Sequence, residues 1–365
     1  VHVGFANATP MVTRRSFCVM GLPVSAMNVD DTVALILDRS QSAPFLIGTP
    51  NLNFVRSSRK SRHFRDNLLL CNLLLVDGMP LVWTAKLLGL PITQRCPGST
   101  VVKCLFEDAG KGALAVGIYG GEQPDMEAVV RWVENHSQVE ILSQVVPGIG
   151  SIDYLSQPRF IEPLTAKPFD LLLTCLSGDK GVNWIAKNHG DIPARVFMQV
   201  GAGLNFLSGS VRRAPETWQK AGLEWLWRTA MEPRLMTRYL FDGLFLIKTI
   251  LTRTLPLALL LRQNRKGRLV EPGFQYKGSG FALFGSLTDG AHLADIISSL
   301  AAHDGEDLSI DFSEVTHMGC EMVAALLKLK AKRDSLNRPL RLTGLPLRLK
   351  LLLWLCMAED LLYLQ

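Results

Sequence analysis

The sequence predicts an α/β protein with a Rossmann-like, mostly parallel sheet and helices on both faces of that sheet. Three observations support this prediction: short apolar runs recur between positions 44 and 200, amphipathic stretches separate them, and glycine or proline marks the turns. Strands buried on both faces appear as continuous apolar runs, and helices between them indicate parallel pairing. A basic amphipathic appendage and a small second α/β domain are expected to follow.

Apolar runs predict the strands of this sheet. In chain order they are Pro44–Thr49, Leu73–Val76, Ala113–Tyr119, Val139–Val146, Phe169–Leu176 and Arg195–Val200. The stretches predicted as helices between them include Leu52–Asn67, Pro124–Ser137 and Gly181–Asn188. In open parallel sheets, ligands bind beyond the carboxyl ends of the strands. We therefore expect a functional site at that edge.

The residues that follow these strands are the least core-like of the region. They are Thr49–Asn51, Asp77–Gly78, Gly120–Glu122, Ser177–Lys180 and Gly201–Gly203. One such loop would be an ordinary turn. Several around one edge of a sheet indicate a binding or catalytic site.

From Ser208 onward the composition changes to arginine, lysine and tryptophan, followed by a stretch rich in Leu, Ile and Phe up to Arg262. Apolar residues flanked by cations and aromatic rings are typical of segments that lie on a membrane surface. A helix docked on the protein's own core or on another subunit would show the same pattern. Pro256 is expected to interrupt a single straight helix.

The last hundred or so residues predict a separate compact domain of strands and helices. Two strands are expected within Phe274–Leu287, with further strands at Leu308–Phe312 and Pro339–Thr343. Helices are expected at Gly290–Ala302, Glu321–Ser335 and Pro346–Met357. The predicted domains are therefore a core at 1–207, the appendage at 208–268 and this domain at 269–365.

Composition excludes several classes of protein. The chain has 365 residues, 48% of them apolar, with a formal net charge of +6, so it is globular rather than disordered. Its 7 cysteines show no C-x-x-C spacing, which favours buried, reduced thiols in a cytoplasmic protein. No two histidines are four residues apart, so no metal site is predicted. We find neither a clean signal peptide nor about 18 consecutive apolar residues without charge, so no membrane span is expected.

Polar residues at the first two strand ends suggest catalytic chemistry. Asp77 is a carboxylate at the end of an apolar strand, where partial desolvation can raise its pKa towards that of a general base. Thr49 and Asn51 offer neutral hydrogen bonds beside it. Arg95 suits a phosphate, and Gly98 lets the backbone approach one. Each also has a structural explanation, since Asp-Gly is a common turn and Thr-Pro-Asn a common helix start.

The ordered set of motifs resembles the WecG/TagA/CpsF glycosyltransferases between about Asn28 and Tyr239. The motifs concerned are Gly48–Asn51, Val76–Gly78, Gln94–Ser99, Gly117–Gly121, Val200–Gly203, Gly209, Arg213–Pro215, Gly222–Arg228 and Glu232–Tyr239. The last two are specific in both order and composition.

This resemblance implies an inverting transferase that moves a sugar from a UDP-sugar to a polyprenyl-pyrophosphate-linked saccharide, with no cofactor or metal ion. It implies that Asp77 is the base for the acceptor hydroxyl and that Thr49 belongs to the same catalytic pocket. The implied substrate-binding residues are Asn51, Arg95, Gly98, Gly120, Lys180, Gly201, Arg213, Arg228, Arg234 and Arg238. The last four would stabilise charge on the departing diphosphate. A solvated basic face or contacts with lipid head groups would equally account for them.

One loop departs from the family pattern. The family has Gly-x-Pro-Lys-Gln-Glu after the fifth strand, followed by x-Trp-Ile. Here Lys180 and Trp184 match, but Gly181 and Val182 replace the Gln and Glu. An N-acetylmannosamine-type donor therefore does not follow from the resemblance, and a plain hexose or a uronic acid is also compatible.

The C-terminal region resembles STAS domains. The residues concerned are Gly285–Leu287, Ser309–Ser313, Val315–Met318, Met322–Leu329 and Leu342–Leu345. Members with a phosphorylation switch have Asp-Ser or Asp-Thr where this chain has Gly319–Glu321. The resemblance therefore implies a static module for docking a protein partner or for self-association.

Together these observations predict a bacterial enzyme of exopolysaccharide or cell-surface glycan assembly, bound peripherally to the inner face of the cytoplasmic membrane. The expected partners are a UDP-sugar, a lipid-linked acceptor and the membrane surface, and no nucleic acid. The alternative is an inactive homologue that serves as a regulatory subunit of a polysaccharide-synthesis complex. A nicotinamide-dependent enzyme is disfavoured, because Gly117–Gly121 is not G-x-G-x-x-G.

Overall fold

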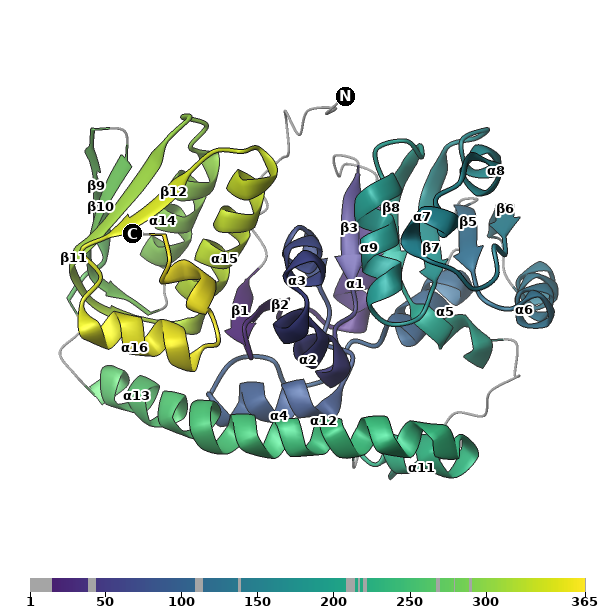
Figure 1. Cartoon of the computed structure of the whole chain (residues 1–365), viewed down its shortest axis with the longest axis horizontal. Coiled ribbons are helices and arrows are strands. Elements are labelled where there is room, and N and C mark those ends of the chain that lie inside the picture. The colour runs from purple at the N-terminus through teal and green to yellow at the C-terminus, as the bar shows by residue number, and fades with distance from the viewer. Residues whose placement is uncertain are drawn as a thin grey trace. The chain divides into compact units, whose positions relative to one another are not determined.

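The computed structural model describes residues 15–38, 44–108, 114–136, 139–207, 214–215, 217–218, 222–266, 270–278, 280–288 and 291–364. These residues form two compact units (Figure 1). The first unit comprises the described residues of 27–79 and 94–244. The second unit comprises those of 15–26, 80–93 and 245–364.

The first unit is built on a six-stranded sheet with the order β4-β3-β8-β7-β5-β6, and every recorded pair is parallel. The strands are β3 (Phe45–Gly48), β4 (Leu73–Leu74), β5 (Ala115–Gly120), β6 (Glu140–Val145), β7 (Phe169–Cys175) and β8 (Ala194–Gln199). Each lies within two residues of its predicted position. The predicted parallel α/β sheet is thus confirmed.

Helices cover both faces of this sheet (Figure 1). They are α1 (Val29–Leu37), α2 (Leu52–Lys60), α3 (Arg62–Leu69), α5 (Gly98–Asp108), α6 (Gln123–His136), α7 (Ile152–Leu155), α8 (Pro158–Ile161) and α9 (Asp179–Asn188). The first unit also contains α11 (Glu224–Met231), which has no buried residues, and short 3-10 turns at Glu162–Leu164, Gly201–Phe206 and Pro233–Leu235. The helix expected over Leu52–Asn67 is two helices, because the Ser61 side chain caps α3 by accepting a hydrogen bond from the Phe64 amide at 3.2 Å.

The core of the first unit lies between the sheet and these helices. On one face, α1, α5 and α6 supply buried residues such as Ile36, Leu105 and Val129. The indole of Trp184 on α9 is fully buried and stacks on Tyr119 of β5 with ring centroids 3.9 Å apart. Burial on both faces explains why the strands are apolar throughout, and it leaves the strand ends as the place for polar side chains.

The second unit contains a mixed four-stranded sheet with the order β12-β11-β10-β9. Its elements are β9 (Gly273–Lys277), β10 (Gly280–Leu287), α14 (Ala291–Ala302), β11 (Leu308–Met318), α15 (Cys320–Ser335), β12 (Leu340–Thr343), α16 (Leu347–Leu355) and a 3-10 turn at Glu359–Leu361. β10 pairs in parallel with β11 and antiparallel with β9. The helix α4 (Met79–Leu87) belongs largely to this unit.

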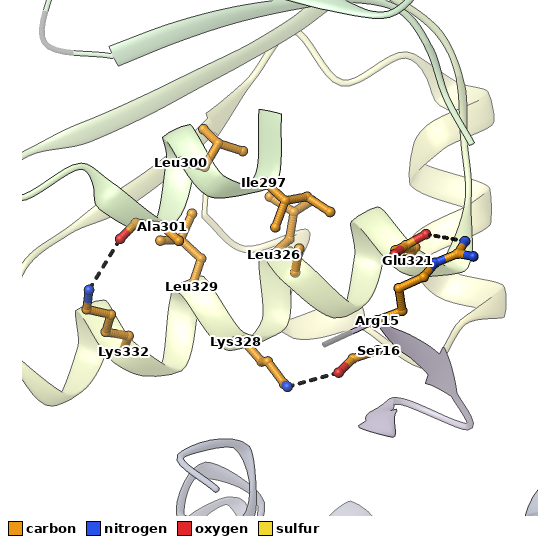
Figure 2. A pocket seen from close by; sticks show the side chains of 11 residues that line it. Arg15, Ser16, Ile297, Leu300, Ala301, Glu321, Leu326, Lys328, Leu329 and Lys332 are labelled. Carbon is orange, nitrogen blue, oxygen red and sulfur yellow. Dashed lines mark hydrogen bonds and ion pairs between the residues drawn. The ribbon is translucent and has the colours of Figure 1, made fainter. Parts of the chain in front are cut away.

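An antiparallel hairpin, β1 (Ser16–Val19) and β2 (Leu22–Ser25), also belongs to the second unit and packs on α15. A pocket lies between β1, α14 and α15, and Figure 2 shows its apolar floor of Ile297, Leu300, Leu326 and Leu329. At its rim Arg15 pairs with Glu321 at 2.9 Å, and the Lys328 ammonium donates to the Ser16 hydroxyl at 3.0 Å. These contacts fasten the hairpin to α15.

A long helical run begins within the first unit. It consists of α12 (Met236–Thr249), a π-helical turn at Ile250–Thr254 and α13 (Leu255–Lys266). The interruption expected at Pro256 takes the form of this π-helical turn, because proline lacks an amide hydrogen and displaces the preceding turn without ending the helix. By length and composition alone, the 32 residues Pro233–Asn264 are long and apolar enough to cross a membrane. The sequence predicts no membrane span there, because charged residues interrupt the apolar stretch.

Candidate active site at the carboxyl edge of the sheet

Backbone hydrogen bonds bring the first predicted site residues together. Beyond the ends of β3 and β4, the amide of Leu75 donates to Gly48 at 2.9 Å and that of Asp77 donates to Pro50 at 3.0 Å. The amide of Cys96 then donates to the carbonyl of Val76 at 2.7 Å. The segments that contain Thr49, Asp77 and Arg95 therefore run side by side at the carboxyl edge.

Thr49 is buried at the centre of this cluster. Its hydroxyl lies 3.0 Å from both the backbone oxygen and the side-chain Oε1 of Gln199, the last residue of β8. Its methyl group faces the start of α5, since a Cβ at Gly98 would stand only 3.0 Å from Thr49 Cγ2. The absence of a side chain at Gly98 lets the first turn of α5 approach Thr49, and the amides of a helix N-terminus favour an anion.

Asp77 is half-buried next to Cys96. Burial raises the pKa of the Cys96 thiol to about 11; a hydrogen bond with Thr32 opposes this, and the carboxylate of Asp77 adds to it. Cys96 is therefore a neutral thiol at neutral pH and a poor acceptor for a proton. Of these two neighbours, Asp77 has the chemistry of a general base.

Asn51 has a structural role as well as a predicted binding role. It is the N-cap of α2, and its side-chain oxygen accepts from the amides of Asn53 at 3.0 Å and Phe54 at 3.3 Å. Such caps contribute about 1 kcal/mol to helix stability. The sequence therefore identified a residue that fixes the start of α2 directly beside Thr49.

Arg95 is held by a carboxylate of the appendage. Its Nη1 lies 2.6 Å from Oε2 of Glu224, and both side chains are largely buried, with 16% and 20% of their surface exposed. Glu224 is the first residue of α11. One turn later, the Arg228 guanidinium lies 5.3 Å from the ring centroid of Phe206, at the end of the 3-10 turn that follows β8. Both contacts hold α11 against Arg95 and the 3-10 turn that follows β8, with Arg228 as the cationic side chain of α11.

No contact joins the described arginines Arg234 and Arg238 to Thr49, Asp77 or Arg95. Arg234 is 84% exposed and pairs with Glu232 at 3.0 Å. Arg238 lies on α12 with its guanidinium 4.8 Å from the ring centroid of Tyr239. Arg213 lies outside the described residues.

A buried ion pair anchors α12 to α2. Arg56 Nε lies 2.6 Å from Asp242 Oδ1. Burial raises the pKa of the Asp242 carboxyl, and the charges of Arg56, Arg238 and Lys60 oppose this rise. A buried charge that loses its partner costs several kcal/mol, so this pair is a fixed attachment of α12 within the first unit.

Gly201, Gly120 and Lys180 lie at the same edge but at different distances from Asp77. Gly201 adjoins Gln199, because a Cβ there would stand 3.4 Å from Gln199 Nε2. Gly120 ends β5, which lies three strands from β3, so the two strands are about 14 Å apart across the sheet. Lys180 on α9 donates to the carbonyl of Gly150 at 2.8 Å, so its ammonium points towards the loop after β6. An extended ligand is needed to reach from Asp77 to these two residues.

Two site residues were missed by the sequence interpretation. Gln199 is a polar residue at the end of an otherwise apolar run, and this position at a strand end could have indicated a site residue. Glu224 lies in a basic, tryptophan-rich segment, and nothing in the sequence pairs it with Arg95, which is 129 residues away. In the described part of the chain, no group of three or more His, Cys, Asp or Glu side chains is arranged to hold a metal ion.

Comparison with known proteins gives one family and several relatives. The model of the "Glycosyl transferase WecG/TagA/CpsF family" matches residues 17–258, more than half of the chain. A protein of Bacillus spizizenii named N-acetylglucosaminyldiphosphoundecaprenol N-acetyl-beta-D-mannosaminyltransferase is 24% identical over 206 residues, which cover 56% of this chain and 77% of the relative. A protein of Bacillus subtilis with the same name is 25% identical over 192 residues, covering 52% and 72%. The matched range begins in the β1–β2 hairpin and ends in α13, before the four-stranded sheet.

Proposed function

This chain belongs to the WecG/TagA/CpsF glycosyltransferase family, and from that premise we propose that it moves a sugar from a UDP-sugar to a polyprenyl-pyrophosphate-linked saccharide. The observation that supports this most directly is the cluster of Thr49, Asp77 and Arg95 at one edge of the sheet. A carboxylate, a helix N-terminus and guanidinium groups are the components that sugar transfer from a nucleotide diphosphate needs.

In the proposed reaction Asp77 takes the proton of the acceptor hydroxyl. The acceptor oxygen forms a bond to the anomeric carbon while the bond from that carbon to the diphosphate oxygen breaks on the opposite side, so the configuration inverts and UDP leaves. A positioned base contributes about 10²–10⁴ in rate. The negative charge that develops on the departing UDP is stabilised by the first turn of α5 and by Arg95 and Arg228.

The proposed acceptor is specified more closely than the sugar of the donor. The names of both relatives specify an N-acetylglucosaminyl diphosphoundecaprenol acceptor and an N-acetylmannosaminyl group. We take the lipid-linked acceptor for this chain and leave the sugar class to include N-acetylated hexoses, plain hexoses and uronic acids, since Gly181 and Val182 lack the polar side chains of the family pattern.

The test is a transfer assay with the full chain, a panel of UDP-sugars and a polyprenyl-pyrophosphate-linked N-acetylglucosamine in anionic vesicles. We expect one donor class to release UDP only when acceptor is present, with the elongated lipid detected by mass spectrometry. We also propose that no metal ion is required, so excess EDTA should leave the rate unchanged. If no donor supports transfer, the chain is instead the inactive, regulatory homologue.

The proposed location is the cytoplasmic face of the cell membrane, in the assembly of an exopolysaccharide or another cell-surface glycan. The exposed apolar side chains of the helical run from α12 to α13 support peripheral attachment, and they include Leu240, Leu244, Ile247, Leu251 and Leu259. The four-stranded sheet and its helices, which lie outside the family match, are proposed as a STAS-like module for a protein partner or for self-association.

Glu224→Ala is expected to raise the KM for the UDP-sugar about tenfold with a smaller effect on kcat. The 2.6 Å contact fixes the Arg95 guanidinium, and its remaining N–H groups can then meet the diphosphate without losing rotamer entropy. The measurement is steady-state kinetics with saturating acceptor. Glu107→Ala is the matched control, because it pairs with the exposed Lys103 at 3.7 Å on the surface of α5 and such pairs contribute little. A Glu224→Ala enzyme with the wild-type KM would contradict this role.

A further inference from the structure

Gln199 is a buried amide with no role in the reaction described so far. It ends β8, between β3 and β7 at the carboxyl edge, and only 3% of its surface is exposed. Burying an amide is costly unless its polar atoms have partners. Its Oε1 lies 3.0 Å from the hydroxyl of Thr49, which also lies 3.0 Å from the Gln199 backbone oxygen. Thr49 therefore fixes the oxygen end of this carboxamide and leaves the nitrogen end for another acceptor.

The position of the amide depends on Gly181. A Cβ at Gly181 would stand 2.6 Å from Gln199 Cγ, a distance that real Cβ atoms essentially never show. The Gln199 side chain thus lies across the space into which a side chain at position 181 would project. This is the position at which the family pattern has glutamine and this chain has none. An amide enters the same space here from β8 instead of α9.

Gly201 adjoins the nitrogen end of the amide. A Cβ there would stand 3.4 Å from Gln199 Nε2 and 3.8 Å from the carbonyl oxygen of Leu176. Because residue 201 is a glycine, no side chain of that residue packs against the amide nitrogen. A hydrogen-bond donor at the strand ends, adjacent to Thr49, is placed to meet a polar ligand.

We propose that Gln199 is the residue of this chain that recognises the donor sugar, through a hydrogen bond from its Nε2 to an oxygen acceptor on the sugar ring or its substituent. This proposal rests on the proposed function, because it presumes that a UDP-sugar occupies the carboxyl edge. The oxygen of a hydroxyl, an acetamido group or a carboxylate on the sugar can accept this hydrogen bond. Gly181 and Gly201 provide the space for the amide, and Thr49 orients it.

The test compares binding of UDP-sugar with binding of UDP by calorimetry, so that its readout does not require turnover. Gln199→Met keeps the length of the side chain, and Thr49 keeps the backbone oxygen of residue 199 as its acceptor. We expect the affinity for the preferred UDP-sugar to fall about tenfold while the affinity for UDP changes less than twofold. Gln275→Met, at an exposed position on β9, is the matched control and should change neither.

A reciprocal pair of variants separates recognition from a purely structural role. Gly181→Gln alone is expected to lose UDP-sugar binding, because its Cβ collides with Gln199. Gly181→Gln combined with Gln199→Gly removes the collision, returns an amide to the space and should restore binding to within about threefold, with an altered preference across the donor panel.

The proposal is overturned if Gln199→Met binds UDP-sugar as the wild type does, if it weakens UDP and UDP-sugar equally, or if the double variant fails to restore binding although its thermal unfolding matches the wild type. These results leave the proposed transferase function intact. Conversely, absence of transfer by the wild type together with the expected binding differences would overturn the catalytic assignment and not this one.

Discussion

Asp77→Asn is expected to lower kcat for sugar transfer by about 10²–10⁴, with the affinity for UDP unchanged. Asparagine has nearly the same shape as aspartate and keeps the amide bond from residue 77 to Pro50, which measures 3.0 Å, so the edge of the sheet should remain intact. It cannot take a proton from the acceptor hydroxyl. The neighbouring Cys96 thiol cannot replace it, because burial, with a contribution from Asp77, raises the pKa of Cys96 to about 11.

The measurement is single-turnover transfer at saturating donor and acceptor, with UDP affinity determined separately. Asp66→Asn is the matched control: Asp66 lies on α3 and pairs with Arg62 at 3.6 Å on the surface, so its loss should change the rate less than twofold. Equal turnover by Asp77→Asn and the wild type would remove Asp77 from the mechanism. Loss of UDP binding as well would indicate a role in folding of the edge.

The second large effect is expected on membrane binding. Exposed apolar residues recur every three or four positions along the long helix and so share one face. They are Met236, Leu240, Leu244, Ile247, Leu251, Leu255 and Leu259. Leu244 and Leu251 are 57% and 60% exposed, so each can bury additional surface in a bilayer. Burial of a leucine side chain is worth about 1.5–3 kcal/mol, so replacing both should weaken binding by about 100-fold or more.

The variant is Leu244→Glu with Leu251→Glu, and the measurement is co-sedimentation with vesicles that contain an anionic phospholipid. Leu347→Glu on α16 is the control, because that leucine is 82% exposed and lies outside the long helix. Unchanged sedimentation of the double variant would contradict surface attachment. Extraction with alkaline carbonate then distinguishes surface binding from a membrane span. It releases a surface-bound chain from the vesicles, whereas a chain that spans the bilayer through Pro233–Asn264 stays in the membrane.

The six-stranded sheet was predictable because each strand is a local apolar run and the loops between strands have ordinary turn residues. The β1–β2 hairpin was not predicted, since its turn at Met20–Gly21 places Met20 at a φ of +49°, where sequence rules expect asparagine, aspartate or glycine. The cluster of Thr49, Asp77 and Arg95 followed from their order at strand ends. Its partners Gln199 and Glu224 did not, because hydrogen bonds and ion pairs between distant segments leave no periodic signal in a sequence.

The buried attachment of α12 to α2 has a geometrical consequence. Arg56 joins Asp242 at 2.6 Å and also donates to Asn53 at 3.2 Å, in the turn that Asn51 caps beside Thr49. Under the proposed membrane attachment, this pair ties the membrane-bound helix to the start of α2, beside Thr49. The fold would then fix the height of Asp77, the proposed base, above the lipid surface. A fixed height would let such an enzyme select its acceptor by the distance of the reacting hydroxyl from the lipid surface.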